Sequence, residues 1–328
     1  MDERITLDCG NGTKATYDLI KDLFIARLSN PVLVELSDAA SLGREVFSCD
    51  GFTVKPIFFP SSDIGKLAVY GTVNDICVSA AVPRYLSLGV IVEEGFRRRD
   101  LEKIVDSLRF AASGCGVKIV CGDFKVVEKK KADKIFITTS GIGYKIKGRD
   151  PSPKKIEDKD EIIITGSIAE HGIAVMLARH KMFDSDIESD CQSLKDIVVP
   201  LWKEFPSIRF MRDPTRGGLA SVMNEMCRTK NIGIRLIEEK IPLRKNVAAA
   251  CELLGIDPYY LASEGRAVIV APPAQARDIV RFLHDRGSLE ASRIGRFTKK
   301  EKGVIMQTIS GGERMLDFSY SFTMPRIC

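Results

Sequence analysis

Residues 51–87 read GFTVKPIFFPSSDIGKLAVYGTVNDICVSAAVPRYLS, and this stretch decides the fold. It contains a β-like run at Val54–Phe59, followed by a small-residue helix predicted from about Asp63 to Ala81. Pro83 ends this helix, because the residue before a proline avoids helical geometry. A second strand is predicted at Tyr85–Glu93. Strand, helix and strand in this order indicate a layered fold of sheets and helices.

The same alternation continues on both sides of this stretch. Upstream, apolar residues at helical spacing predict an amphipathic helix over 15–28, and Glu45–Cys49 is a short strand. Downstream, the first half adds a helix at 101–112 and strands at 117–121 and 134–144. The second half is predicted to hold strands at 162–165, 232–238, 266–271, 291–297 and 303–309, and helices at 170–181, 190–204, 216–229, 245–254 and 274–286. We therefore expect an α+β fold made of two domains.

A change of composition marks the boundary between these domains. Residues 145–160, KIKGRDPSPKKIEDKD, combine lysines, acids and prolines with few apolar residues. We expect a first domain at 1–148 and a second at 149–318. The last residues, SYSFTMPRIC, show no periodicity, so 319–328 is predicted to be an extended mobile tail.

Charge and hydropathy exclude several classes of protein. Lys and Arg number 49 against 44 Asp and Glu, and a net charge of +5 is too small to indicate nucleic-acid binding. No apolar run reaches the roughly 18 residues of a membrane span, and Asp2, Glu3, Arg4 and Asp8 argue against a signal peptide. The nine cysteines form no C-x-x-C motif, which favours a cytosolic protein with buried thiols. Cys328 differs, because it is the last residue of the sequence.

Carboxylates at the expected ends of strands predict a cation site. Asp50, Asp123 and Asp213 each follow a strand, Asp38 precedes a small-residue turn, and Asp75 lies in the segment GTVNDICVSAA. Side chains at strand ends project into the crevice where α/β proteins bind ligands. Several acids converging there would bind Mg²⁺, and a turn or cap role is the alternative for any one of them.

Four further features could carry chemistry. Lys125 lies two residues after Asp123, so both side chains leave the same face of a strand and suit a polyphosphate. Glu264, in a Ser-Glu-Gly turn before a strand, could serve as a base, with a plain turn carboxylate as the alternative. His171, near the start of a helix, is either structural or functional. Residues 10–14, Gly-Asn-Gly-Thr-Lys, could wrap an anion but match no phosphate-binding motif.

Several segments together resemble the HypE family of hydrogenase-maturation carbamoyl dehydratases. In chain order they are residues 51–87, GDFKVVE, SGIGY, GSIAEHGIAVM, RDPTRGGLASVMNEM, CELLGIDPYYLASEGR and the terminal PRIC. The family belongs to the ATP-binding superfamily of aminoimidazole ribonucleotide synthetase, thiamine-monophosphate kinase and selenophosphate synthetase. These segments span almost the whole chain in the family's order, and the terminal Pro-Arg-Ile-Cys is the most specific of them.

The resemblance implies an aminoimidazole-ribonucleotide-synthetase-like fold, with a dimerising N-terminal sheet domain and ATP between the two domains. It implies that Asp50, Asp75 and Asp123 hold Mg²⁺ and that Cys328, Lys125 and Glu264 are catalytic. The further nucleotide-binding residues that it implies are Asp38, Lys66, Asn74, Gly122 and Asp213. The implied partners are a second subunit, a carbamoyltransferase maturation protein and scaffold proteins of hydrogenase iron-centre assembly.

The implied reaction converts an S-carbamoyl group on Cys328 into an S-cyano group, which supplies cyanide to nickel–iron hydrogenase. ATP phosphorylates the amide oxygen, so that phosphate leaves in place of hydroxide. A cysteine at the end of a tail can reach a buried ATP and then a separate acceptor.

The chain departs from the family pattern in three glycine-rich segments. Residues 9–13 replace His-Gly-x-Gly-Gly, Ser61 and Ser62 replace two glycines, and Phe124 replaces a threonine. We therefore expect activity with altered nucleotide contacts. Two alternatives stay open. Cys9 would suit a selenophosphate-synthetase-like enzyme, and ATP could instead be a structural ligand in a non-catalytic assembly scaffold.

Overall fold

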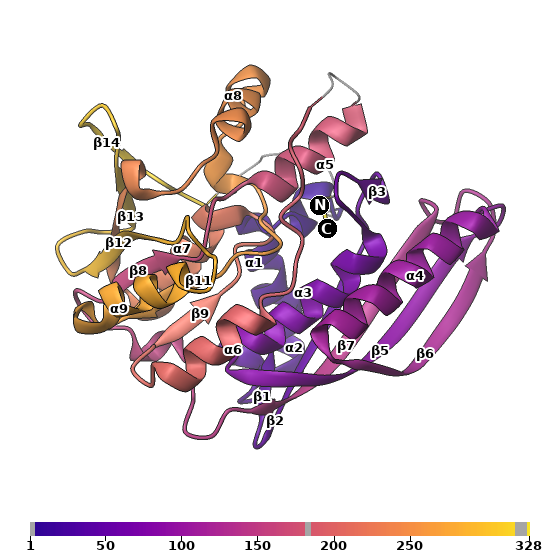
Figure 1. Ribbon diagram of the computed structural model, residues 1–328, viewed down its shortest axis with the longest axis horizontal. Coiled ribbons are helices and arrows are strands. Elements are labelled where there is room, and N and C mark those ends of the chain that lie inside the picture. Colours follow the sequence, from indigo (N-terminus) through magenta and orange to yellow (C-terminus); the bar gives the residue numbers. More distant parts are fainter. Residues whose placement is uncertain (1–3, 181–184, 319–326) are drawn as a thin grey trace.

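The computed structural model describes residues 4–180, 185–318 and 327–328. Its strands form two large sheets that lie side by side and carry the helices (Figure 1). The first sheet has the strand order β1-β2-β7-β5-β6, and the second has the order β14-β13-β10-β12-β8-β11-β9. The first sheet ends at Lys145 and the second begins at Glu161, so the predicted junction at 145–160 falls between them.

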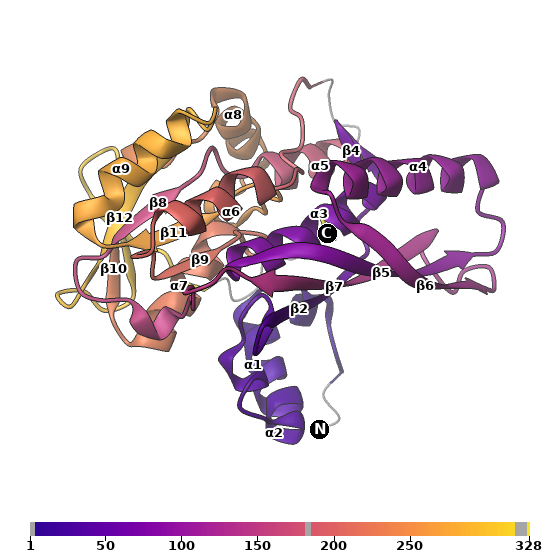
Figure 2. The same cartoon turned by 60° about the horizontal axis from the view of Figure 1, so that its bottom comes forward.

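The first sheet has one face covered by helices. It consists of β1 (Ala40–Leu42), β2 (Glu45–Phe52), β5 (Ala81–Glu93), β6 (Lys118–Val127) and β7 (Ile135–Lys145). Its pairs are antiparallel except for β5 with β6. Burial alternates along β2 and β7, as expected for a sheet with one covered face. The helices α3 (Ile64–Val78) and α4 (Arg98–Cys115) cover that face (Figure 2).

The central helix α3 is buried on almost every side. It packs against the first sheet, against α4 and against α6 and β9 of the second domain, which explains its small residues and its lack of an apolar stripe. The Asp63 carboxylate caps the helix by accepting hydrogen bonds from the backbone N–H groups of Gly65 and Lys66, at 2.7 and 3.1 Å.

The second domain is a mixed sheet with helices. Its strands are β8 (Glu161–Ile164), β9 (Phe210–Arg212), β10 (Gly233–Ile237), β11 (Val268–Ala271), β12 (Ser292–Thr298), β13 (Val304–Gln307) and β14 (Glu313–Met315). Its helices are α5 (Glu170–His180), α6 (Lys195–Glu204), α7 (Gly218–Lys230), α8 (Lys245–Leu254) and α9 (Pro273–His284). Every residue of β11 is buried, which explains its continuous apolar sequence.

Direct hydrogen bonds join the two domains. The Asn74 amide nitrogen donates to the backbone oxygens of Gln192 and Glu264, at 3.0 and 3.2 Å, and its oxygen accepts from the Leu194 N–H at 2.8 Å. The Trp202 indole donates to the Cys77 carbonyl at 3.0 Å. Buried bonds of this kind fix how the site residues of one domain face those of the other.

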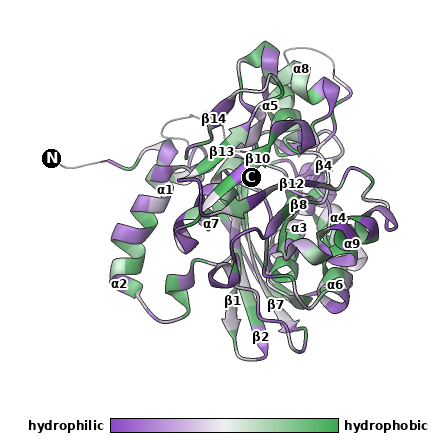
Figure 3. Cartoon of the chain, turned by 90° about the vertical axis from the view of Figure 1, so that its left-hand side faces the viewer, coloured by the Kyte–Doolittle hydropathy of each residue, from purple (hydrophilic) through white to green (hydrophobic). Residues whose placement is uncertain are grey.

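The predicted N-terminal amphipathic helix is present, but none of its residues is buried. Helix α1 (Lys14–Leu19), a π-helical segment at Ile20–Ile25 and α2 (Ala26–Leu28) occupy the predicted range. The side chains of Leu23, Phe24 and Leu28 are nevertheless exposed. This arm projects from the body and shows both hydrophobic and hydrophilic positions (Figures 2 and 3). Periodicity predicted the helix, but it could not predict which surface would cover it.

Three smaller points concern the expected elements. Within 54–59 only β3 (Phe58–Phe59) is a strand, and it pairs with β4 (Ser62–Asp63). The helix expected from 190 begins at Lys195, whose N–H bonds to the Ser193 hydroxyl at 3.2 Å. The predicted mobile tail covers 319–328, of which 319–326 lie outside the described residues. Ile327 and Cys328 are described, and they are held by hydrogen bonds, contrary to that prediction. In the described part of the chain, no helix is long and apolar enough to cross a membrane.

Candidate active site

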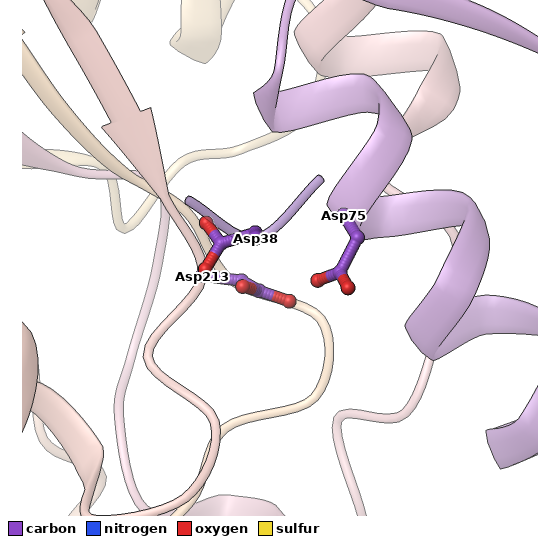
Figure 4. Close-up of side chains that lie close together, drawn as sticks. All are labelled: Asp38, Asp75 and Asp213. Carbon is purple, nitrogen blue, oxygen red and sulfur yellow. The ribbon is translucent and has the colours of Figure 1, made fainter. Parts of the chain in front are cut away.

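Three carboxylates from distant parts of the chain meet where the two domains face each other. Asp38 precedes β1, Asp75 lies in α3, and Asp213 directly follows β9. Each offers an oxygen, and these oxygens all lie within 4.8 Å of one another. Figure 4 shows Asp75 pointing from its helix toward Asp38 and Asp213. Three acids held this close repel one another, so their arrangement fits a cation.

Burial raises the pKa of each of these acids. The pKa of Asp38 rises from 3.8 to about 6, even though Arg212, 2.9 Å from its carboxylate, opposes the change. The pKa values of Asp75 and Asp213 lie well above 3.8, because burial and then neighbouring carboxylates disfavour their charged forms. Only oxygen ligands are offered, which is the donor set of a hard divalent cation.

Asp50 lies beside this cluster on β2. Its Oδ2 accepts a hydrogen bond from Thr72 Oγ1 at 2.8 Å, while Ser48 Oγ donates to Asp75 at 2.7 Å. Burial raises the pKa of Asp50, and the Thr72 hydrogen bond partly offsets the rise. The fold therefore brings together four of the five aspartates that the sequence singled out, namely Asp38, Asp50, Asp75 and Asp213.

Cys328 lies next to the same acids. A cavity of about 50 Å³ is lined by Thr53, Arg216, Gly217, Tyr260, Ile327, Cys328 and residues 10–11. Burial raises the pKa of the Cys328 thiol to about 12, with Arg216 opposing the rise and Glu264 and Asp50 adding to it. The cysteine that the sequence singled out thus lies within electrostatic reach of the predicted acids.

Glu264 is a buried carboxyl group with a strongly raised pKa. Its backbone N–H donates to Asp190 Oδ1 at 3.0 Å. Its Oε1 is buried and has no hydrogen-bond partner among the described residues. Burial, followed by the nearby Asp190, raises the pKa of Glu264 from 4.5 to about 8. A carboxyl group that titrates near neutral pH and keeps an oxygen unused is suited to proton transfer.

Sequence reasoning missed Arg216, the main positive charge near the thiol. This largely buried side chain has a raised pKa, chiefly because of Cys328 and then Asp50. Gly12 has a φ of +68°, and a Cβ there would lie 2.7 Å from the Arg216 carbonyl oxygen, so the N-terminal loop packs directly on this turn. The available signal was an arginine before two glycines and a helix in RDPTRGGL.

Asp123 and Lys125 do not join the cluster within one chain. Their side chains are 66% and 65% exposed on β6 and form an ion pair at 2.5 Å. Across the sheet, Asp50 pairs with Thr139, Thr139 with Leu88, and Leu88 with Gly122, so these four residues are neighbours on adjacent strands and share one face. Asp123, one residue further along β6, therefore points to the opposite face of the sheet. The predicted metal set of Asp50, Asp75 and Asp123 does not meet in a single chain, and Asp38 and Asp213 join Asp75 instead.

The other predicted nucleotide-binding residues have structural contacts. A Cβ at Gly122 would lie 2.5 Å from the Leu88 carbonyl oxygen, so glycine allows β5 and β6 to approach. The Asn74 amide is occupied by the bonds between the domains described above. Lys66 Nζ donates to the Ser61 carbonyl at 3.3 Å. Nucleotide roles for these three residues stay predictions.

Replacing Asp75 by asparagine is expected to stabilise the ligand-free protein and to remove its response to Mg²⁺. Because the folded state raises the pKa of Asp75, the folded state holds a proton that the unfolded chain releases. The stability from this group is full below about pH 4 and is lost as the pH rises through the folded pKa. Calorimetry between about pH 5 and 8, with and without Mg²⁺, measures both effects.

Asp106→Asn is the matched control for this prediction, because the Asp106 side chain is 74% exposed on α4 and does not belong to the cluster. It should change neither the pH dependence of stability nor the shift caused by Mg²⁺. If Asp75→Asn keeps the shift caused by Mg²⁺, the cation binds elsewhere.

Comparison with known proteins names the class to which this fold and site belong. Residues 36–144 match the N-terminal domain of AIR synthase related proteins, and residues 157–307 match their C-terminal domain. The thiamine monophosphate kinase of Aquifex aeolicus superposes with a TM-score of 0.68 at 16% identity, over 90% of this chain and 97% of that one, and so shares the fold.

More similar relatives narrow this class to one family. The carbamoyl dehydratase HypE of Azotobacter vinelandii is 42% identical over 327 residues, 97% of this chain and 96% of that protein. A structure of HypE in complex with ATP superposes with a TM-score of 0.84 at 40% identity, over 99% and 100% of the two chains. A HypE–HypF complex gives a TM-score of 0.88 at 42% identity, over 92% and 99%. The chain belongs to the HypE family, which confirms both the resemblance and the two-domain α+β fold.

Proposed function

We propose that this chain is an ATP-dependent carbamoyl dehydratase that carries its substrate group on Cys328. The main observation behind this proposal is the position of the Cys328 thiol. It shares a cavity with Arg216 and is under the electrostatic influence of Glu264 and Asp50. Burying polar and charged groups costs free energy unless they are paired, so this arrangement is expected to serve a function. The relatives named carbamoyl dehydratase, and the relative solved with ATP, support this reading.

The chemistry requires a leaving group and a base. Phosphoryl transfer from ATP lets the carbamoyl oxygen leave as phosphate, with ADP as the other product. The carbamoyl nitrogen loses both protons as the C≡N bond forms. Glu264, with its unpartnered Oε1, is placed to accept a proton, and Arg216 stabilises the negative charge that develops.

In this proposal Asp38, Asp75 and Asp213 hold Mg²⁺, with Asp50 beside them. When bound, the ion would neutralise phosphate oxygens during phosphoryl transfer. Arg212 keeps the first of these acids in place, because it pairs with Asp38 at 2.9 Å and with Glu225 at 2.6 Å. The cluster thus has the oxygen ligands and the support that such a site requires.

Mass spectrometry of Cys328 tests the function. A partner of the HypF kind, as in the complex of the relative, is the expected carbamoyl donor. The carbamoylated chain, freed of ATP, should keep its adduct and should lose one water only after ATP is added. A modification on Cys9 would favour the selenophosphate-like alternative. Bound nucleotide without loss of water would favour a non-catalytic scaffold for hydrogenase iron-centre assembly.

We also propose a homodimer formed through the open face of the first sheet. Helices cover one face of this sheet, and β6 forms its edge (Figure 2). Most residues of β6 are exposed. Phe47, Tyr85, Ile91 and Tyr144 are each exposed by about 40%, specifically 39%, 40%, 40% and 44%. Large apolar side chains gathered on a sheet face are typical of an interface. Asp123 points to this face, so its predicted role, and that of Lys125, would depend on the second subunit.

Ile91→Asp is expected to convert the dimer into a monomer at micromolar concentration, because a buried unpaired charge is strongly unfavourable in an interface. Light scattering coupled to size exclusion measures the mass. Phe110→Asp, on the exposed side of α4, is the control and should remain dimeric. A monomeric wild-type chain at the same concentration would contradict the proposal.

A further inference from the structure

A buried hydrogen-bond relay leads to the last residues of the chain. His171, at the start of α5, is fully buried, and its Nε2 lies 2.6 Å from the carbonyl oxygen of Ile327. Its Nδ1 lies 2.8 Å from Ser189 Oγ, which also accepts a hydrogen bond from the Cys191 N–H at 3.1 Å. Every group in this relay therefore has a partner.

The partners of His171 decide its tautomer. A carbonyl oxygen only accepts hydrogen bonds, so Nε2 carries the hydrogen that points to Ile327. A neutral ring carries only one N–H, so Nδ1 is an acceptor and receives the hydrogen of Ser189 Oγ. Burial lowers the pKa of His171 to about 4, in keeping with a neutral ring. The rings of Phe59 and His171 pack edge to face, with centroids 5.3 Å apart and planes at 85°. This contact restricts the plane of the imidazole.

A second attachment point lies on the other domain. The backbone N–H and Oγ1 of Thr53, which follows β2, lie 3.3 and 3.2 Å from the carbonyl oxygen of Cys328, and both donate to it. The Ile327 side chain is also buried and belongs to the hydrophobic core. The last two residues are therefore held from both domains.

These contacts hold the main chain on both sides of the Cys328 Cα. One oxygen belongs to the peptide group before it, and the other is the main-chain oxygen of Cys328 itself. With both groups held, rotation about χ1 is the main freedom left to Sγ. None of the bonds uses the sulfur, so the same contacts can form whether Cys328 carries a free thiol or a modified one.

We propose that His171, oriented by Ser189 and acting together with Thr53, is a positioning residue that seats the Ile327–Cys328 peptide beside Arg216 and Glu264. Its meaning for catalysis rests on the proposed function, in which the group on Cys328 is dehydrated. Misplacing a reacting atom by about 1 Å can slow a reaction about 100-fold. His171 acts through the Ile327 backbone, so it controls where the sulfur lies without taking part in the chemistry.

Iodoacetamide labelling of the full ligand-free chain, read by peptide mass spectrometry, tests the seating directly. In the folded wild type, Cys328 should react more slowly than it does in the chain unfolded by guanidinium, since its raised pKa leaves little thiolate. His171→Phe removes the donor to Ile327 and should raise the Cys328 rate about fivefold or more, the loss of one net hydrogen bond. Thr53→Val should raise it in the same way.

Two further variants separate positioning from a general loss of structure. His171→Gln keeps an N–H donor and should restore part of the protection. His284→Phe removes a comparable bond, from a histidine to the Ala291 carbonyl at 2.9 Å, and should leave Cys328 labelling unchanged. The buried Cys77 should stay protected throughout. If His171→Phe does not fold, Ser189→Ala is the milder variant, and it should also speed labelling of Cys328.

Unchanged Cys328 labelling in a folded variant would overturn the proposal, and so would labelling that rises equally at Cys77. In single-turnover dehydration, His171→Phe should lower the maximal rate. The ATP concentration that gives half of the maximal rate should not change. The labelling needs neither ATP nor a partner protein. A failure of dehydration in the wild type would therefore reject the proposed function and leave the seating result intact.

Discussion

Cys328→Ala should form no cyanated product while still binding ATP. The missing sulfur is the atom on which the substrate group is carried, whereas the acids proposed to hold Mg²⁺ come from the segment before β1, from α3 and from the segment after β9. Nucleotide binding is measured by calorimetry with a non-hydrolysable ATP analogue. Product is measured by mass spectrometry of the intact chain after incubation with the carbamoyl donor and ATP.

Cys9→Ala and Cys49→Ala are the matched controls, because neither thiol lines the cavity at Cys328. Both variants should keep full product formation. Product on any cysteine of the Cys328→Ala protein would contradict the assignment. Loss of product in Cys9→Ala alone would point to the selenophosphate-like alternative.

Glu264→Gln is expected to slow dehydration by about 1000-fold, within the range that general acid–base catalysis contributes. In the free wild-type enzyme the base form of Glu264 accumulates only as the pH approaches about 8. The value of kcat/KM for ATP should therefore rise with pH and level off above that point. The glutamine variant should show a low rate without this rise. A wild-type rate in Glu264→Gln would mean that the base is another group.

The same substitution should change stability in a way that identifies the group. The folded state raises the pKa of Glu264 from 4.5 to about 8, so its contribution to stability is full below pH 4.5 and is lost as the pH rises to about 8. Glutamine imitates the protonated acid at every pH. Glu264→Gln should thus unfold at a higher temperature than the wild type at about pH 9 and at a similar one at about pH 5.

Glu170→Gln provides the contrast for this stability measurement. Glu170 is equally buried, but its carboxylate is paired with Arg266 at 2.6 Å and with Arg244 at 2.7 Å. Removing its charge leaves Arg266, whose side chain is only 12% exposed, without its partner, so this variant should be destabilised across the whole pH range. If the unfolding temperature at about pH 9 rises in Glu264→Gln and falls in Glu170→Gln, the unpaired catalytic acid is distinguished from the structural one.

The sequence by itself determined the elements and the family. Alternation in Glu45–Cys49 and the small residues after Asp63 depend on neighbours a few positions away, so a strand and a buried helix could be predicted from local pattern. The segments that resemble HypE singled out Asp50, Asp75, Glu264 and Cys328 as candidate site residues. The structure brings these residues together, although their individual roles stay proposals.

Only the tertiary structure decided which charges meet. Asp123 was grouped with Asp50 because both follow strands, yet the register of β2, β7, β5 and β6 turns them to opposite faces of one sheet. A shift of one residue reverses a side chain, and register depends on pairing between segments far apart in sequence. Asp38 instead reaches Asp75 because β1 begins where the second domain packs.

Arg216 and His171 show the same limit for a different reason. Nothing near Arg216 in the sequence indicates that it faces Cys328, more than 100 residues away. His171 likewise meets Ile327 only when α5 packs against the end of the chain. Local periodicity fixes which residues form a helix or strand, because those forces act between near neighbours. The partners of a buried charge or ring are fixed by how the domains pack, so only the folded chain could decide them.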